Sequence, residues 1–101
     1  MKSFIEKRIF QGFVCIHILH HAQKSPVYGS QMMEELSSHG YKISPGTLYP
    51  LLHSLEREGL LKKYEEKVAG KIRKYYAVTD LGESQLVKAK VYLDELAGEV
   101  M

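Results

Sequence analysis

Residues 44 to 59 read SPGTLYPLLHSLEREG, and this stretch decides the fold. Ser44 is a good N-cap and Pro45 suits the first helical position, so a helix is predicted to begin here. Four leucines then form one apolar stripe at helical spacing: Leu48, Leu51, Leu52 and Leu55. Pro50 removes a backbone hydrogen bond, but the stripe continues beyond it, so we expect a local bend in an unbroken helix. Gly59 is predicted to end the helix.

Two more helices are predicted upstream of this one. Through residues 3–23, apolar side chains recur every three or four positions: Ile5, Ile9, Phe13, Ile16 and Leu19. Pro26 ends this helix because it pushes Ser25 out of helical geometry. A second helix is expected from about Tyr28 to Ser38, followed by an exit at Gly40.

A β-hairpin and a last helix are predicted downstream. Two short, Tyr-rich segments, 60–67 and 72–78, are separated by a turn that contains Gly70. Thr79 then caps a final helix, which has acidic residues in its first turn, where the helix dipole favours them. The order of three helices, a hairpin and a helix is the arrangement of a winged helix.

Composition limits the possible classes of protein. The chain has 101 residues, 45% hydrophobic and 26% charged, which suits one globular domain. Its formal net charge is only +2, so an argument for nucleic-acid binding must rest on where the charges lie. Cys15 is the single cysteine, which favours a reducing compartment, and we expect a cytoplasmic protein. The apolar stretch at 10–19 is interrupted by polar residues, so neither an export signal nor a membrane span is expected.

The helix after Ser44 presents a polar face opposite its leucines. That face carries hydrogen-bonding groups of moderate size: Thr47, Tyr49, His53 and Ser54. Such groups can enter a major groove and meet base edges or phosphates. Small residues at the start of the helix, Ser44 and Gly46, would let its N–H groups approach a phosphate. An ordinary solvated face has the same composition, so the helix alone leaves that alternative open.

The predicted hairpin concentrates positive charge. Six of the 14 Lys and Arg residues lie in it: Lys62, Lys63, Lys67, Lys71, Arg73 and Lys74. Glu65 and Glu66 offset them only in part. A tip at Gly70 with basic neighbours could reach phosphates or a narrow minor groove. The alternative is a charged edge hairpin whose lysines oppose aggregation.

Four motifs in this order resemble the PadR family of transcriptional regulators. They are YG at 28–29, SPGTLYPLL at 44–52, LEREGLL at 55–61 and RKYYAVT at 73–79. The resemblance begins near Ile9 and extends past Leu86. It implies a mainly α fold with a small β-hairpin, which is a winged helix-turn-helix with a C-terminal dimerisation helix. It also implies a homodimer that binds a pseudo-palindromic operator in double-stranded DNA, usually as a repressor.

The resemblance also assigns roles to residues. By motif it places Thr47 and Tyr49 on the recognition helix and Gly70, Lys71 and Arg73 on the wing. The full predicted DNA-binding set adds Ser44, Gly46 and His53 on the recognition helix, Tyr28 and Ser30 on the second helix and Lys74 on the wing. Ser30 departs from the family, which often has an aromatic residue there, and this weakens the case for contacts from the second helix. Strand alternation predicts Tyr76 and Val78 inward, with Arg73 and Tyr75 on the other side.

The chain looks like the short branch of that family, with a DNA-binding unit at 1–79 and a dimerisation helix at 80–101 in one compact unit. In that branch the last helix packs with the partner's first helix. The predicted dimer interface is therefore Ile5, Ile9, Leu86, Ala89, Leu93 and Leu96. The alternative is that this stripe packs wholly within the protomer.

Some short relatives bind flat aromatic drugs between subunits with a tryptophan. This chain has none, so a small aromatic effector would meet Phe4, Tyr92 and Met101 instead.

Other candidate sites have plainer explanations. His17 and His21 have a spacing that can hold Zn²⁺, but no nearby acid completes the set and Cys15 lies on another face. We therefore expect structural histidines, an inert buried thiol, no metal and no cofactor. Ser44 and His53 lack an orienting acid, so an enzyme is not expected. The alternatives to a DNA-binding regulator are a winged-helix protein-interaction module and a metal-responsive sensor.

Overall fold

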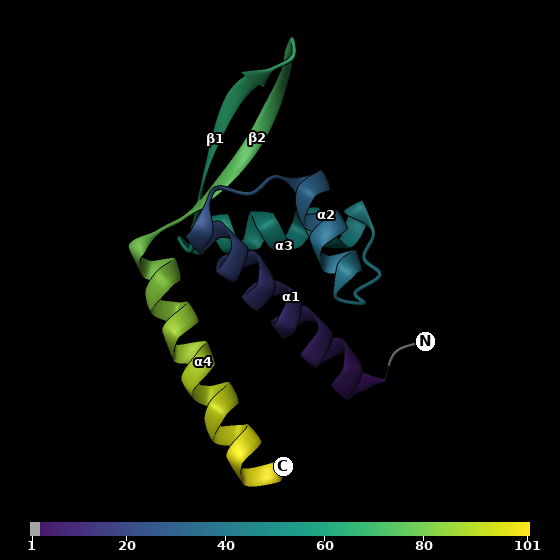
Figure 1. Cartoon of the computed structure of the whole chain (residues 1–101), viewed down its shortest axis with the longest axis vertical. Coiled ribbons are helices and arrows are strands. Elements are labelled where there is room, and N and C mark those ends of the chain that lie inside the picture. Colours follow the sequence, from purple (N-terminus) through teal and green to yellow (C-terminus); the bar gives the residue numbers. More distant parts are fainter. Residues whose placement is uncertain (1–2) are drawn as a thin grey trace.

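The computed structural model describes residues 3–101 and shows four helices and one hairpin in the predicted order (Figure 1). The elements are α1 (Phe4–Lys24), α2 (Gly29–Ser38), α3 (Pro45–Arg57), β1 (Leu61–Val68), β2 (Lys71–Val78) and α4 (Asp80–Val100). The predicted fold class is confirmed. Met1 and Lys2, the first two residues of the predicted unit 1–79, lie outside the described residues.

Helix boundaries follow the capping residues. The Ser3 hydroxyl accepts a hydrogen bond from the backbone N–H of Glu6 at 3.2 Å, which fixes the start of α1. α3 begins at Pro45 and runs through Pro50 to Arg57, so the prediction of an unbroken helix is confirmed. Gly59 then takes φ of +83°, a conformation that favours glycine, and the chain leaves the helix.

The hairpin is long and tightly closed. β1 pairs antiparallel with β2 from Leu61↔Val78 to Val68↔Lys71, which leaves only Ala69 and Gly70 in the turn. Both turn residues have positive φ, +51° and +80°, as a type I′ turn requires. Figure 1 shows the hairpin projecting away from the helices.

A single-residue bridge joins the α1–α2 connection to the base of the hairpin. The N–H of Val27 donates to the Tyr76 carbonyl at 2.9 Å, and the N–H of Tyr76 donates to the Val27 carbonyl at 2.8 Å. The sequence did not predict this bridge. It places the start of α2 against β2.

The core lies where the helices meet the base of the hairpin. Its buried side chains come from all four helices, both strands and the α1–α2 connection: Val14, Ile18, Leu19, Ala22, Val27, Met32, Leu36, Leu48, Leu52, Leu55, Leu61, Tyr76 and Leu86. The inward direction predicted for Tyr76 is confirmed. Apart from the phenol of Tyr76, the buried side chains of residues 3–101 are apolar. The core is thus built from apolar packing, and the histidines and acids lie around it.

The start of α4 is fixed against the α3–β1 connection. The Thr79 hydroxyl accepts from the N–H of Gly82 at 3.0 Å and donates to the carbonyl of Gly59 at 2.5 Å. A β-carbon at Gly82 would lie 2.7 Å from Cγ2 of Val78, so only glycine allows this approach. Over residues 3–101, no helix has both the length and the apolar character needed to cross a membrane.

Candidate nucleic-acid interface

The outward face of α3 is exposed, as predicted. Thr47, Tyr49 and His53 are exposed, while the leucines behind them face the core. The Ser44 hydroxyl lies 3.4 Å from the Thr47 hydroxyl and does not cap the backbone. A β-carbon at Gly46 would meet no atom closer than 3.8 Å. The first turn of α3 is therefore open to an approaching anion.

The Tyr49 side chain is held against the start of α2. A β-carbon at Gly29 would lie 2.5 Å from Cζ and 2.8 Å from Cε1 of Tyr49, so the ring lies directly on the glycine backbone. The structure shows that this glycine makes room for a predicted recognition residue.

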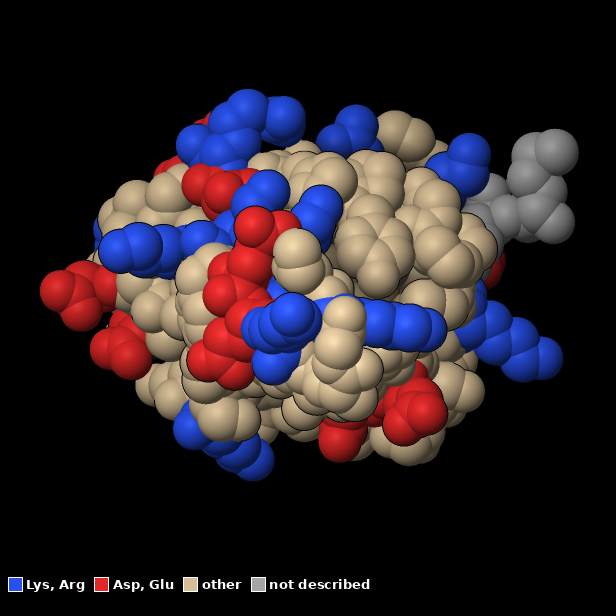
Figure 2. All heavy atoms as spheres, turned by 90° about the horizontal axis from the view of Figure 1, so that it is seen from above, with Lys and Arg blue, Asp and Glu red and all other residues tan. Residues whose placement is uncertain are grey.

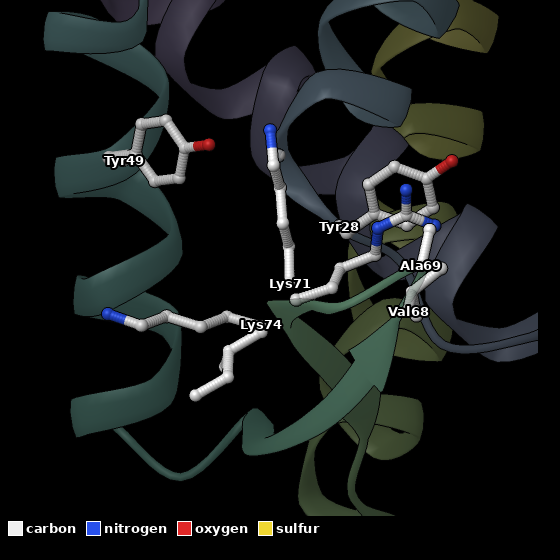
Figure 3. Close-up of a pocket in the computed structure, with 9 residues that line it drawn as sticks. Tyr28, Tyr49, Val68, Ala69, Lys71 and Lys74 are labelled. Carbon is white, nitrogen blue, oxygen red and sulfur yellow. The ribbon is translucent and has the colours of Figure 1, made fainter.

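A hollow of about 730 Å³ lies between α3 and the hairpin. It is lined by Tyr28, Gly29, Tyr49, Val68, Ala69, Lys71, Ile72, Arg73 and Lys74. In Figure 3, Tyr49 points into this space from α3, and the Lys74 side chain extends from the hairpin towards the same helix. The structure thus brings the predicted recognition helix and the predicted wing to the two sides of one open concave surface.

Arg73 lies on the side of the hairpin that faces α2. Its guanidinium carbon is 4.0 Å from the centre of the Tyr28 ring, and Nη1 donates to the Tyr75 hydroxyl at 3.4 Å. The Tyr75 ring lies edge-on to Tyr28 at 5.5 Å and stacks on Tyr64 at 5.4 Å. This arrangement follows from the Val27 bridge, which brings Tyr28 beside alternate residues of β2. Arg73 and Tyr28 thus join the hairpin to the start of α2 through a cation–π contact.

Basic side chains remain exposed along the rest of the hairpin. Exposed lysines lie on both strands: Lys62, Lys63, Lys67, Lys71 and Lys74. In the strand register Glu65 is opposite Lys74 and Glu66 is opposite Arg73, so the acids offset part of the charge. Figure 2, which looks down on the hairpin end, shows Lys and Arg side chains across this face with Asp and Glu between them.

The predicted dimer residues fall into two groups. Ile5, Ile9, Leu93 and Leu96 are exposed in the protomer, with Ile5 at 62% and Leu96 at 53%, and Ala89 is half-buried. The stripe therefore does not pack wholly within the protomer. The prediction that Leu86 lies in the dimer interface is wrong, because this side chain is only 1% exposed and belongs to the protomer's own core. It lies in the second turn of α4, where that helix still packs on α1 and β2.

The structure also locates the predicted effector residues, the single cysteine and the histidines of α1. Phe4, Tyr92 and Met101 are exposed on the protomer surface. Cys15 is half-buried, and burial raises the pKa of its thiol, which suits an unreactive thiol. Two further residues, Glu35 and His39, lie beside His17 and His21. The sequence did not indicate them, because they come from α2 and its C-terminal cap.

Comparison with known proteins gives one consistent result. Residues 18–88 match the family described as "Transcriptional regulator PadR-like family". The chain is 48% identical to the transcriptional regulator Rv3488 of Mycobacterium tuberculosis, over 87% of this chain and 82% of that protein. It superposes with a TM-score of 0.83 on a PadR-like transcription factor from Bacteroides fragilis, which is 30% identical, over 97% and 96% of the two chains. A PadR-like transcriptional regulator from Bacillus cereus gives a TM-score of 0.79 at 30% identity, over 97% and 93%.

Proposed function

The chain belongs to the PadR-like family of transcriptional regulators, and on that premise we propose that it is a homodimeric repressor that reads a pseudo-palindromic operator in duplex DNA. The family and these relatives are regulators and not enzymes. The observation that carries the proposal is the hollow between α3 and the hairpin, with Tyr28 and Tyr49 on one wall and Lys71 and Lys74 on the other.

In this proposal α3 enters the major groove, which is about 12 Å wide and admits one helix. Thr47, Tyr49 and His53 then face base edges, while Ser44 and Gly46 bring the first turn close to a phosphate. Gly70, Lys71 and Lys74 contact the flanking backbone as the wing. Ser30 is exposed beside Gly29 and approaches the same DNA strand, while Tyr28 and Arg73 act by holding the wing in place.

A second copy of this chain is the proposed occupant of the exposed apolar surface. Residues 91–100 of α4 are exposed throughout, and Figure 1 shows α4 and the first half of α1 diverging from each other. Ile5, Ile9, Leu93 and Leu96 on these two helices form apolar surface that a lone soluble protomer would leave in water. To read two half-sites one helical turn of DNA apart, the dimer would need its two copies of α3 about 34–36 Å apart.

We further propose that the apolar space between α1 and α4 accepts a small aromatic effector. A hollow of about 340 Å³ there is lined by Phe13, Ile16, His17, His20, Tyr41, Lys90 and Leu93. A planar compound bound beside the dimer surface would change the separation of the two recognition helices and so relieve repression. Calorimetric titration of the protein with planar aromatic compounds tests this, and no heat beyond dilution would contradict it.

The DNA-binding proposal is tested by fluorescence anisotropy with a labelled random-sequence duplex at several salt concentrations. Repression by blocking polymerase needs tight DNA binding. If lysines contact phosphates, the logarithm of the binding constant falls linearly with the logarithm of the salt concentration. Absence of any salt-dependent binding would instead favour a winged-helix module that meets a partner protein through the same face.

A further inference from the structure

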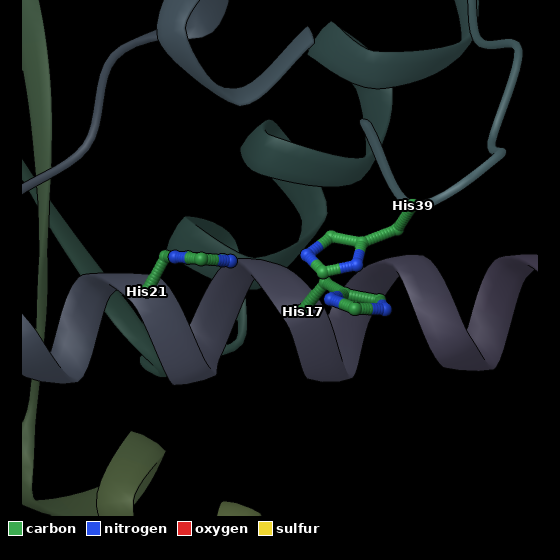
Figure 4. A group of neighbouring side chains, drawn as sticks. All are labelled: His17, His21 and His39. Carbon is green, nitrogen blue, oxygen red and sulfur yellow. The ribbon is translucent and has the colours of Figure 1, made fainter. Parts of the chain in front are cut away.

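Three histidines from two elements meet on the side of α1 that faces α2. His17 and His21 lie one turn apart on α1, and His39 caps the C-terminus of α2. One ring nitrogen from each of the three lies within 4.8 Å of the others. Figure 4 shows the His39 ring over His17 and the His21 ring one turn farther along the same helix.

A carboxylate lies beside two of the three histidines, outside the close group of ring nitrogens. Oε2 of Glu35 lies 3.7 Å from Nε2 of His21 and 3.9 Å from Nε2 of His39. Glu35 and His39 are four residues apart at the end of α2, as His17 and His21 are on α1. Two such pairs therefore face each other and offer three imidazoles and one carboxylate, the kind of donor set that tetrahedral Zn²⁺ takes.

We propose that His17, His21, His39 and Glu35 bind one divalent transition-metal ion of the Zn²⁺ class per protomer. Imidazole ligands suit zinc, copper and nickel, whereas calcium and magnesium prefer oxygen ligands. Nitrogens this close leave a point within about 2.8 Å of all three, and the rings would have to turn to reach the Zn–N distance of about 2.0 Å.

The side chains are free to make that adjustment. His39 is half-exposed at a helix end, and its backbone bonds to α2 do not depend on its ring. The rings of His17 and His39 now stack at 4.8 Å, and an ion would turn them from face-to-face contact to edge-on coordination. His20 contacts His21 at 5.3 Å but does not belong to the group, so it provides a matched control on the same helix.

The ion would tie α1 to α2. α1 carries the proposed dimer surface and α2 precedes the proposed recognition helix, so occupancy would couple these two parts of the protomer. The metal site itself does not depend on the proposed function, because it follows from side-chain positions alone.

The test is titration of tag-free, chelator-treated protein with Co²⁺, followed by visible absorption. We expect one Co²⁺ per protomer with the intense bands of four-coordinate cobalt, displaced by one equivalent of Zn²⁺. His39→Asn should weaken binding at least about tenfold, Glu35→Gln should weaken it measurably, and His20→Asn should leave it unchanged. Circular dichroism checks that each variant is folded.

The proposal is overturned if wild-type protein gives only the weak spectrum of hydrated cobalt. It is equally overturned if folded His39→Asn and Glu35→Gln bind as the wild type does, in which case the histidines only stack on one another. Loss of binding in His20→Asn would move the site elsewhere on α1 and contradict the ligand set. None of these outcomes involves DNA, so failure here is distinct from failure of the proposed repressor function.

Discussion

The ring of Tyr49 on α3 rests on the backbone of Gly29, the first residue of α2. The two residues are 20 positions apart in the sequence, and a β-carbon at position 29 would lie 2.5 Å from Cζ of the tyrosine. Tyr49 is nevertheless 39% exposed, so its ring is held on one side and open on the other. The contact fixes where the phenol lies on the face proposed to meet DNA.

Gly29→Ala should therefore alter DNA recognition with little loss of stability. The new methyl group displaces the exposed end of a flexible side chain, which can move into solvent. We expect reduced preference for the selected operator over random duplex, by an amount close to that of Tyr49→Ala. The measurement is the ratio of the dissociation constants for random duplex and for the operator, taken for each variant. If the variant that combines Gly29→Ala with Tyr49→Ala has a much lower operator preference than Tyr49→Ala alone, Gly29 affects recognition independently of Tyr49.

Lys71 and Lys74 should contribute affinity without sequence preference. Each phosphate contact that is lost should lower the slope of log K against log salt by about 0.9. Because the proposed dimer carries two copies of each lysine, the variant Lys71→Gln/Lys74→Gln is expected to lose about 3.6 units of slope on both operator and random duplex. Lys88→Gln, an exposed lysine on α4, serves as the control. An unchanged slope in the double variant would remove the hairpin from the DNA interface.

Leu96→Glu should dissociate the proposed dimer. A carboxylate without a partner in an apolar interface costs about 3 kcal/mol or more, which raises the dissociation constant at least about a hundredfold. Val91→Glu is the matched control, because Val91 is also exposed but lies on the opposite side of α4. Analytical ultracentrifugation measures both. Equal dissociation of the two variants, or of neither, would argue against the assigned face.

Thr79→Ala should destabilise the protomer by about 1–2 kcal/mol. It removes the cap of the Gly82 N–H and the hydrogen bond to the Gly59 carbonyl. Thr79→Ser keeps the hydroxyl and should retain most of the free energy of unfolding. Urea denaturation followed by circular dichroism compares them. If serine is no better than alanine, the methyl group and not the hydroxyl holds α4.

If the proposed metal site and the proposed DNA-binding function are both correct, metal removal should change DNA affinity. An ion between α1 and α2 would affect the position of α3, the helix that follows α2. The expected result is a different operator dissociation constant with saturating Zn²⁺ than with chelator in wild-type protein. The same comparison in His39→Asn should show no difference. A zinc effect of equal size in that variant would place the responsible metal outside the histidine group.

The elements were predictable from the sequence because their ends carry local information. Ser44-Pro45 begins α3 and Gly59 ends it, and the leucine stripe continues through Pro50 because the packing of that face outweighs one lost hydrogen bond. The turn at Gly70 was predictable for the same reason. These are all effects of residues within one turn of each other.

The parts that were not predictable depend on distant residues. His39 joins His17 and His21 only because the end of α2 folds back over α1, and no spacing in the sequence indicates this. The Val27 bridge is one residue long and has no strand pattern. Leu86 continues the stripe of the dimer residues but lies deep enough to be covered by its own protomer.

The most direct test of the central claim is selection from a randomised duplex library with purified protein, followed by sequencing of the bound fraction. The account predicts a two-fold symmetric motif with half-sites about one helical turn apart, and a changed base preference in each half-site for Tyr49→Ala. An enriched motif without two-fold symmetry would contradict the dimer. No enrichment at all would contradict operator recognition by α3.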